Sequence, residues 1–503
     1  MKEFIFKYKY LIFAAIVIIH FAFKFYKCGE AGLWFDECFS VQLAQKPVSE
    51  IIRISMQDDP NPPLYGVLAH YWMKAFGDSE AGLRSLSVLA SALAAGILFL
   101  LCLNFFNWQT SIFASLMYFT SNELYYYGLE GRTYALIILF VISSYYLFLS
   151  IIKRPTFLKA ILFAIANACI FYSHFLACFV IIGEVVLFPF LAFQGGSISL
   201  VNENISFNIK ARAKTLVYIM LSTLVFTVFV WPWKDRTIFL LLEGGKAMWL
   251  AKPTYAEFKQ CTYEFFNSKE LYQVHIFSAI LFVVLLCVKR FREEEFSWRM
   301  FLFAVVVGPG LMYFNYFAAS FTPIFLKRYI LYSFLGFIFI YSYLFSMLKF
   351  PFWIKLVLFA VLSGFSFSKL VYPREAYYEY HKAVPFLKAT QKNGGTLIIN
   401  DMQDVFSYYY DKEIFRIPMY HLKHAELRKH DVYTPFNQTW PQEEDFSMYH
   451  DIYYTRTFWG YYDPAENIPK QLAQKYTWVG DGPDFKGIKI SHYTNPNYKA
   501  KEK

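Results

Sequence analysis

Acidic residues that could act as a base recur beside long apolar segments of the sequence. Asp36 and Glu37 stand next to each other in WFDECFS (34–40), immediately after the first apolar segment. A third acid, Glu130, stands in LEGRTY (129–134), after a further pair of apolar segments. Because a bilayer core tolerates carboxylates poorly, acids placed repeatedly at a membrane boundary indicate a functional site. The elements that position these acids have to be found in the rest of the sequence.

The composition is that of a membrane protein. Of 503 residues, 57% are hydrophobic, 21% aromatic and only 17% charged, whereas a soluble domain carries roughly 25% charged residues. The net charge of +10 is spread over short clusters at the ends of apolar segments. This spread is typical of membrane topology and argues against nucleic-acid binding. The seven cysteines form no C-x-x-C pair, so neither a zinc site nor a disulfide framework is indicated.

The apolar segments predict an all-α polytopic membrane domain of about 11 transmembrane helices. Lys2, Lys7 and Lys9 precede the first span, so we predict a cytoplasmic N-terminus. The cluster KRFREEEFSWR (289–299) marks another cytoplasmic loop. The predicted spans are about 8–26, 83–103, 111–128, 133–152, 157–172, 175–193, 215–232, 272–288, 300–320, 329–348 and 352–369.

The sequence predicts two domains. Residues 1–370 form the transmembrane domain, with long outer loops at 27–82 and 233–271. The first loop holds a short amphipathic piece, VSEIIRISM, and then YGVLAHYWMKAF, which is too short and too polar to span, so we expect the latter in the interface plane. Residues 371–503 lose the apolar runs and form a small extracytoplasmic α/β or α+β domain. Its predicted elements are a helix at 376–391 and strands at 396–400, 451–456 and 487–493.

The predicted topology places polar residues from five outer segments at one level of the bilayer. They suit a substrate with an apolar tail and an anionic head, because arginine binds phosphate and a carboxylate can accept a hydroxyl proton. For a sugar linked to a lipid phosphate, one base and two or three cations would suffice. These residues are Asp36, Glu37, Asp58, Asp59, Arg84, Glu130, Arg132, His174, Lys327 and Arg328.

Six motifs in order resemble one enzyme family. They are WFDE-x-x-S, NPPLY, GLRSLS, YYYGLEGRTYAL, FYSHF and FLKRY, which together cover roughly residues 8–370. This series resembles the bacterial family 39-type glycosyltransferases of the GT-C superfamily, which includes protein mannosyltransferases and the lipid A aminoarabinose transferase. The resemblance implies a polyprenyl-phosphate sugar donor, an extracytoplasmic acceptor (lipid A, a glycan or a protein) and inversion at the anomeric carbon.

The resemblance also implies roles for individual residues. It makes Asp36 the catalytic base, with Glu37 beside it. It assigns the donor phosphate and sugar to positions that include the family's E-x-R-x-Y and R-Y elements, namely Arg84, Glu130, Arg132, Tyr134, His174, Lys327, Arg328 and Tyr329. Acceptor or loop positioning falls to Asp58, Asp59, Asn61 and Tyr65. The family usually has histidine where this chain has Asn61, and asparagine cannot titrate, so no proton transfer is expected there.

Structural alternatives stay open at each of these positions. Asp36 and Glu37 could cap an interfacial helix. Glu130 and Arg132 could form a loop ion pair, and Arg84 could anchor its helix at the headgroup level. The remaining alternatives are a structural interfacial histidine at His174, turn formation by Asp58 and Asp59, and the absence of a site role for Lys327 and Arg328, although their place on the outer side runs against the positive-inside bias.

Two other functional classes are alternatives to the transferase. A secondary transporter would carry acids near mid-membrane, often in paired halves, and neither feature is present in the sequence. A non-catalytic envelope assembly subunit would act through its external domain. The transferase hypothesis requires no cofactor, although carboxylates could take Mg²⁺ or Mn²⁺. It implies the bacterial inner membrane, with the active site and the C-terminal domain on the extracytoplasmic side.

Overall fold

The structure is a computed structural model that divides into two compact units. It describes residues 1–57, 61–192, 209–242, 251–291, 293, 296–435, 446–457, 467–496 and 498. The helical unit comprises Met1–Cys28, Val48–Leu68 and Arg84–Tyr372, and the sheet unit comprises Gly29–Pro47, Ala69–Leu83 and Pro373–Lys503. The chain therefore enters the sheet unit twice before its C-terminal segment, at two stretches of the predicted first outer loop. We describe each unit by itself.

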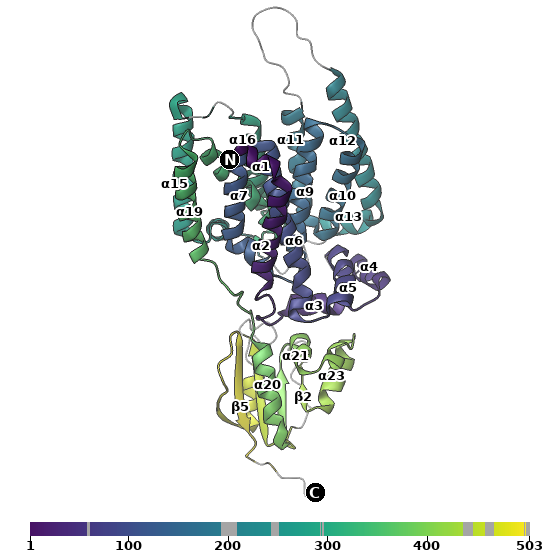
Figure 1. The fold of residues 1–503 in the computed structure, drawn as a ribbon. Coiled ribbons are helices and arrows are strands. Elements are labelled where there is room, and N and C mark those ends of the chain that lie inside the picture. Colours follow the sequence, from purple (N-terminus) through teal and green to yellow (C-terminus); the bar gives the residue numbers. More distant parts are fainter. Residues whose placement is uncertain are drawn as a thin grey trace, which may run out of the picture. The chain divides into compact units, whose positions relative to one another are not determined.

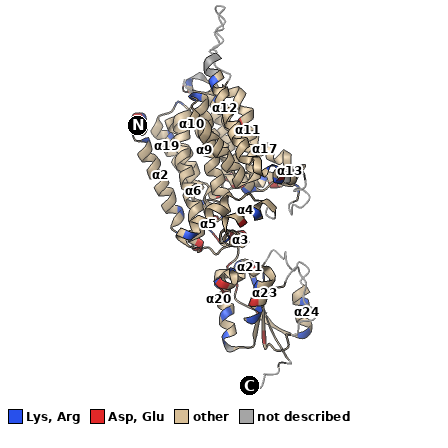
Figure 2. Cartoon of the chain, turned by 90° about the vertical axis from the view of Figure 1, so that its right-hand side faces the viewer, with Lys and Arg blue, Asp and Glu red and all other residues tan. Residues whose placement is uncertain are grey.

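The helical unit consists of apolar helices whose middle parts carry few charges, as α6, α9 and α10 show in Figure 2. Its N-terminal half contains α1 (Lys2–Lys7), α2 (Lys9–Phe25), α4 (Val48–Gln57), α5 (Leu64–Phe76), α6 (Glu80–Leu101), α7 (Trp108–Thr120), α8 (Asn122–Tyr126), α9 (Tyr134–Lys153), α10 (Phe157–Ser173) and α11 (Phe179–Ala192). Its C-terminal half contains α12 (Ile209–Val230), α13 (Lys234–Leu242), α14 (Tyr255–Phe265), α15 (Lys269–Cys287), α16 (Trp298–Val305), α17 (Leu311–Ala319), α18 (Phe334–Ser346) and α19 (Phe352–Ser368). The last residues of α5 and the first of α6 belong to the sheet unit.

The predicted multi-pass membrane domain is confirmed. Within the described residues, six helices are long and apolar enough to cross a bilayer, and three further apolar helices are shorter. Each of the predicted spans lies on a helical segment, although the third is broken at Ser121 between α7 and α8. The two loop segments predicted not to span are the short helices α4 and α5.

Small residues let two helical segments of this unit approach closely. Gly336 of α18 lies against Gly308, and a Cβ on either residue would clash with the backbone of the other segment. Close backbone approach at small residues is a general device of membrane helix packing, because lipid supplies no hydrophobic drive between helices. Around this contact, phenylalanine, tyrosine and leucine side chains form one continuous buried cluster.

The sheet unit contains a five-stranded mixed sheet with helices packed on it (Figure 1). The strand order is β2-β1-β3-β5-β4, with β1 parallel to β2 and β3, and β5 antiparallel to β3 and β4. All residues of β1 are buried, because helices cover both of its faces. The elements are α3 (Phe35–Ala44), α20 (Tyr380–Thr390), β1 (Thr396–Asn400), α21 (Gln403–Tyr410), α22 (Lys412–Phe415), α23 (Tyr420–Lys429), β2 (Val432–Tyr433), β3 (Asp451–Thr457), α24 (Asn467–Lys475), β4 (Thr477–Asp481) and β5 (Ile488–Thr494).

Candidate active site

Two loops of the helical unit meet at the start of α9. The amide of Arg132 donates to the carbonyl of Glu130 at 2.7 Å, which forms a tight turn before the helix. The hydroxyl of Thr133 donates to the carbonyl of Ser173 at 3.0 Å and so ties this turn to the end of α10. The Glu130 side chain is fully buried. The E-x-R-x-Y element is therefore held against the turn that carries His174.

His174 sits between two cations and an aromatic ring. Its imidazole lies 4.7 Å from the ring of Tyr329, centroid to centroid. Burial, followed by the charges of Arg132 and Arg328, lowers the pKa of His174 to about 3. The Nδ1 atom accepts from the amide of Leu176 at 3.2 Å, so the proton of the neutral ring is on Nε2. His174 is thus a neutral hydrogen-bond donor beside two guanidinium groups.

Tyr134, the first residue of α9, completes this group. It is 3% exposed and lies within electrostatic reach of Arg328, Arg132 and Glu130. The structure thus brings together six of the predicted donor-binding residues, which we call the arginine cluster: Glu130, Arg132, Tyr134, His174, Arg328 and Tyr329. Two guanidinium groups, a neutral imidazole and a tyrosine present several donors to one small region, which suits a phosphate group.

Lys327 makes contacts that the sequence did not predict. Its ammonium pairs with Glu123 at 2.9 Å and with Glu264 at 2.8 Å. Glu123 is 4% exposed, so Lys327 is the counter-charge of a buried carboxylate. The lysine therefore joins α8, α14 and the R-Y element. This arrangement gives Lys327 a structural role in joining these segments, and its role in phosphate binding stays a prediction.

Five other predicted residues of the helical unit are not included in the arginine cluster. Arg84 is 1% exposed, and its guanidinium donates to the carbonyl of Cys28 at 2.8 Å, a contact that fits the anchoring alternative. Tyr65 is buried in the first turn of α5, and Asn61 is half-buried just before that helix. Asp58 and Asp59 lie outside the described residues. The roles predicted for these five residues stay predictions.

Asp36 and Glu37 lie in the first turn of α3, in the sheet unit. Glu37 is fully buried, and one of its oxygens accepts from the amide of Trp34 at 3.4 Å, which caps the helix. The other oxygen accepts from the guanidinium of Arg374 at 3.1 Å. Asp36 is half-buried. Glu37 thus has the capping role considered from the sequence, together with an ion pair that the sequence did not predict.

Side chains of the C-terminal segment hold both ends of α3. At its start, the hydroxyl of Tyr409 accepts from the amide of Leu33 at 2.6 Å and donates to Glu80 at 2.8 Å. Towards its end, the Gln42 amide donates to Asp404 at 2.8 Å. We call the contacts of Arg374, Tyr409 and Asp404 with this helix region the α3 clamp.

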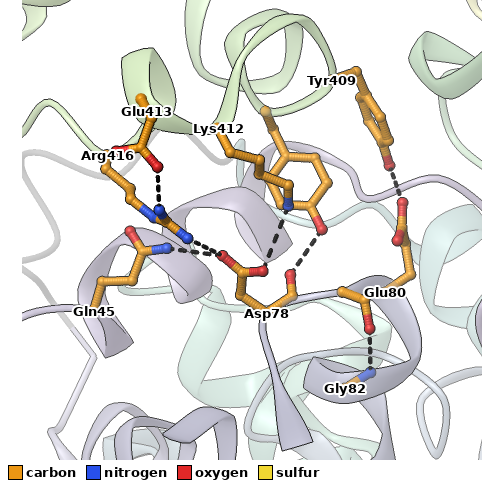
Figure 3. Close-up of polar contacts among 10 residues, drawn as sticks. Gln45, Asp78, Glu80, Gly82, Tyr409, Lys412, Glu413 and Arg416 are labelled. Atoms are coloured by element: carbon orange, nitrogen blue, oxygen red, sulfur yellow. Dashed lines mark hydrogen bonds and ion pairs between the residues drawn. The ribbon is translucent and has the colours of Figure 1, made fainter.

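A second set of contacts fixes the turn before α6 (Figure 3). Asp78 accepts from Gln45 at 3.2 Å and pairs with Lys412 at 3.8 Å and Arg416 at 3.6 Å. Its carbonyl accepts from the Tyr408 hydroxyl at 2.8 Å. These ion pairs are partly exposed and individually weak. Their number nevertheless shows that the early loop segments and the C-terminal segment form one folded unit.

The carboxylates show no metal-binding arrangement in the part of the chain that the structure describes. No three histidine, cysteine, aspartate or glutamate side chains come together there as a potential ligand set. The positive charge in the arginine cluster and beside it comes from arginine and lysine side chains. Binding of Mg²⁺ or Mn²⁺ stays a prediction.

Comparison with known proteins relates part of the chain to one family and its fold to one solved structure. Residues 60–233 match the family model described as dolichyl-phosphate-mannose-protein mannosyltransferase. A comparison with curated proteins found no match. Among solved structures, the chain resembles ArnT from Cupriavidus metallidurans bound to undecaprenyl phosphate, with a TM-score of 0.55, 9% identity, and coverage of 96% of this chain and 97% of that chain.

Two further solved structures resemble the chain more distantly. The Archaeoglobus fulgidus oligosaccharyltransferase gives a TM-score of 0.46 and 12% identity, over 95% of this chain and 73% of that chain. The protein O-mannosyltransferase complex of S. cerevisiae gives 0.35 and 13%, over 46% and 34%. The family match covers about a third of the chain, and the likeness to ArnT shows that the chain shares the fold of that protein over nearly its whole length. Residues 60–233 thus resemble the mannosyltransferase family, and the fold agrees with the one that the motifs predicted.

Proposed function

We propose that this protein transfers a sugar from a polyprenyl-phosphate donor to an extracytoplasmic acceptor, with inversion at the anomeric carbon. The observation that carries the proposal is the arginine cluster, in which Arg132 and Arg328 act on the same neutral histidine. A lipid-linked phosphate needs cationic, water-poor surroundings close to the membrane. The ArnT structure, solved with undecaprenyl phosphate, supports a donor of this chemistry.

The proposed reaction is a single displacement. The acceptor hydroxyl oxygen forms a bond to the anomeric carbon, and the bond from this carbon to the phosphate oxygen breaks. The electron pair of that bond goes to the phosphate, where Arg132 and Arg328 stabilise the added charge. The hydroxyl proton goes to the carboxylate of Asp36, which acts as general base. Attack opposite the leaving phosphate inverts the anomeric centre.

The neighbouring residues have supporting roles in this proposal. The Nε2–H group of His174 and the hydroxyl of Tyr134 donate hydrogen bonds to the phosphate or the sugar. Glu37 acts as a positioning residue, because its contacts with Trp34 and Arg374 fix the first turn of α3 and therefore the place of Asp36. Asp58, Asp59, Asn61 and Tyr65 position the acceptor or the loop that receives it.

The proposal places the protein in the bacterial inner membrane with a cytoplasmic N-terminus. The site and the C-terminal segment then face the extracytoplasmic side, where lipid A, a glycan or a protein serves as acceptor. Mass spectrometry of envelope lipids and glycans from a deletion strain identifies the acceptor by the sugar that it loses. An unchanged envelope would contradict a role in envelope glycosylation.

Binding of undecaprenyl phosphate to the purified full chain tests the donor site. Arg132→Gln and Arg328→Gln should each weaken binding about 10- to 100-fold, because each removes charged hydrogen bonds to the phosphate. Lys234→Gln is the matched control, since it removes an exposed cation of the predicted second outer loop that pairs with Asp235 and is not a predicted donor-binding residue. Equal affinities in all three variants would contradict the assignment of the arginine cluster to the donor phosphate.

A further inference from the structure

A second group of cations lines a cavity elsewhere in the helical unit. The cavity has a volume of about 180 Å³ and is lined by Lys9, Lys153, Arg154 and Lys159, among others. Lys9 begins α2, Lys153 ends α9 and Arg154 follows it, and Lys159 lies in the first turn of α10. None of the residues that line the cavity is an aspartate or a glutamate. Four positive charges therefore share one cavity without a carboxylate among its lining residues.

Main-chain carbonyls orient two of these cations. The ammonium of Lys159 donates to the carbonyl of Arg154 at 2.8 Å and to that of Ser150 at 3.2 Å. The ammonium of Lys153 donates to the carbonyl of Asn104 at 3.2 Å. Such carbonyls at the ends of helices carry partial negative charge and stabilise cations. These contacts explain why the two lysines lie here, but they do not use all of the ammonium hydrogens.

In the described part of the chain, the other two cations, Arg154 and Lys9, have no such contacts with main-chain carbonyls. Among the residues that the structure describes, the guanidinium of Arg154 and the ammonium of Lys9 have no hydrogen-bonding or ion-pairing partner in the protein. Like charges in one cavity repel each other, so the arrangement gains stability when an anion enters. Arginine and lysine together suit a phosphate group, since arginine offers paired donors and lysine a compact charge.

Exposed apolar side chains beside the cavity indicate that the phosphate belongs to a lipid. Tyr10, which lines the cavity, is 70% exposed, and its neighbour Leu11 is 68% exposed. Phe157 and Leu158, next to Lys159, are 61% and 66% exposed. Such side chains at the ends of membrane helices suit contact with acyl chains. We propose that this cavity binds the phosphate headgroup of an anionic phospholipid.

This site is separate from the proposed sugar transfer, because none of its residues belongs to the arginine cluster or to α3. The predicted topology places it at the cytoplasmic ends of the helices. Basic pockets between membrane helices on that side are a recognised setting for anionic lipid headgroups.

Native mass spectrometry of the purified full chain with phosphatidylglycerol tests the proposal. Arg154→Gln should weaken the first bound phosphatidylglycerol about fivefold, and the triple variant Lys153→Gln, Arg154→Gln, Lys159→Gln about 100-fold. The matched control changes three cations that do not line the cavity: Lys214→Gln, Arg299→Gln and Lys349→Gln. Equal losses in the cavity triple and the control triple would overturn the proposal.

Two further measurements, together with the single variant, decide between the remaining outcomes. Phosphatidylcholine, which carries no net charge, should bind equally to the original chain and to both triple variants. Excess inorganic phosphate should leave the phosphatidylglycerol adduct in place, and full displacement would assign the cavity to free phosphate and contradict the lipid proposal. The single variant Arg154→Gln removes a side chain without a described partner, so it should fold even where the triple variant does not.

Discussion

Glu37 and Arg374 form an ion pair at 3.1 Å although 337 positions separate them in the sequence. Their side chains are 0% and 3% exposed. Burial of two charges is favourable only when each keeps its partner, because neither can be solvated. The pair therefore joins the first turn of α3 to the segment that precedes α20, and each charge depends on the other.

Removing one partner of this pair should destabilise the sheet unit strongly. Arg374→Met leaves the Glu37 carboxylate buried without its cation, which should cost about 3–5 kcal/mol of unfolding free energy. Thermal unfolding of the full chain measures the loss. Lys382→Met, which breaks the more exposed pair with Glu379 in the same unit, should change stability by less than about 1 kcal/mol. Similar losses in both variants would contradict a special role for the buried pair.

The α3 clamp should affect turnover more than donor binding. Tyr409→Phe removes the hydroxyl that accepts from Leu33 and donates to Glu80, and it leaves a main-chain amide without its acceptor. This costs about 1–3 kcal/mol, and we expect kcat to fall about tenfold because α3 carries Asp36. The Kd for undecaprenyl phosphate should not change.

Tyr410→Phe is the control for the Tyr409 experiment. Its hydroxyl donates to Gln391 at 3.0 Å and has no contact with α3. Turnover should therefore stay near that of the original chain. If the two variants lose the same activity, the contact between Tyr409 and Leu33 has no specific function.

The stability of the protein should fall on acidification through His174. The unfolded state takes up a proton on this histidine near pH 6.5, whereas in the folded protein its pKa is about 3. Between these two values the unfolded state binds more protons, so stability rises with pH and levels off above about 6.5. From pH 7 to pH 4 this single group should cost up to about 3 kcal/mol.

His174→Asn should remove this pH dependence. Asparagine can still accept from the amide of Leu176 but does not titrate. Melting temperatures of the original chain and the variant, compared from pH 7 down to pH 4, measure the difference. Parallel curves would show that His174 is protonated equally in the folded and unfolded states. At pH 6–8 the ring stays neutral, so the variant should not shift the pH optimum of transfer.

Removal of divalent metal should leave transfer unchanged. In this account Arg132 and Arg328 carry the charge stabilisation, so EDTA should not lower the rate. The measurement is the transfer rate of the reconstituted enzyme with EDTA and with added Mg²⁺ or Mn²⁺. Loss of activity in EDTA that Mg²⁺ or Mn²⁺ restores would assign part of this role to a metal.

The sequence predicted most of the helical unit because a single physical constraint dominates it. A bilayer requires long uninterrupted apolar segments, and these are visible without any knowledge of tertiary contacts. In the sheet unit, the strands at 396–400, 451–456 and 487–493 correspond to β1, β3 and β5. The strands β2 and β4 were not predicted. β2 has only two residues, and β4 is largely exposed and contains Gly480 at φ 157°.

The contacts within the site could be predicted only in part. The motifs indicated that Glu130, Arg132 and Arg328 act together, because each occurs in a recognisable local pattern. Glu37 pairs with Arg374, which is hundreds of residues away in the sequence. Lys327 pairs with Glu123 and Glu264, which lie several helices earlier. No local sequence pattern marks these partners. The grouping of Gly29–Pro47 and Ala69–Leu83 with the C-terminal segment likewise depends on tertiary packing that hydropathy does not reveal.

The most direct test of the central claim is the transfer rate of Asp36→Asn in the reconstituted full chain. Loss of a general base should lower turnover about 10²- to 10⁴-fold, while undecaprenyl phosphate should bind as before. Glu30→Gln, which neutralises another acid of the same loop, is the control and should stay active. Turnover by Asp36→Asn equal to that of the control would contradict the assignment of Asp36 as the base.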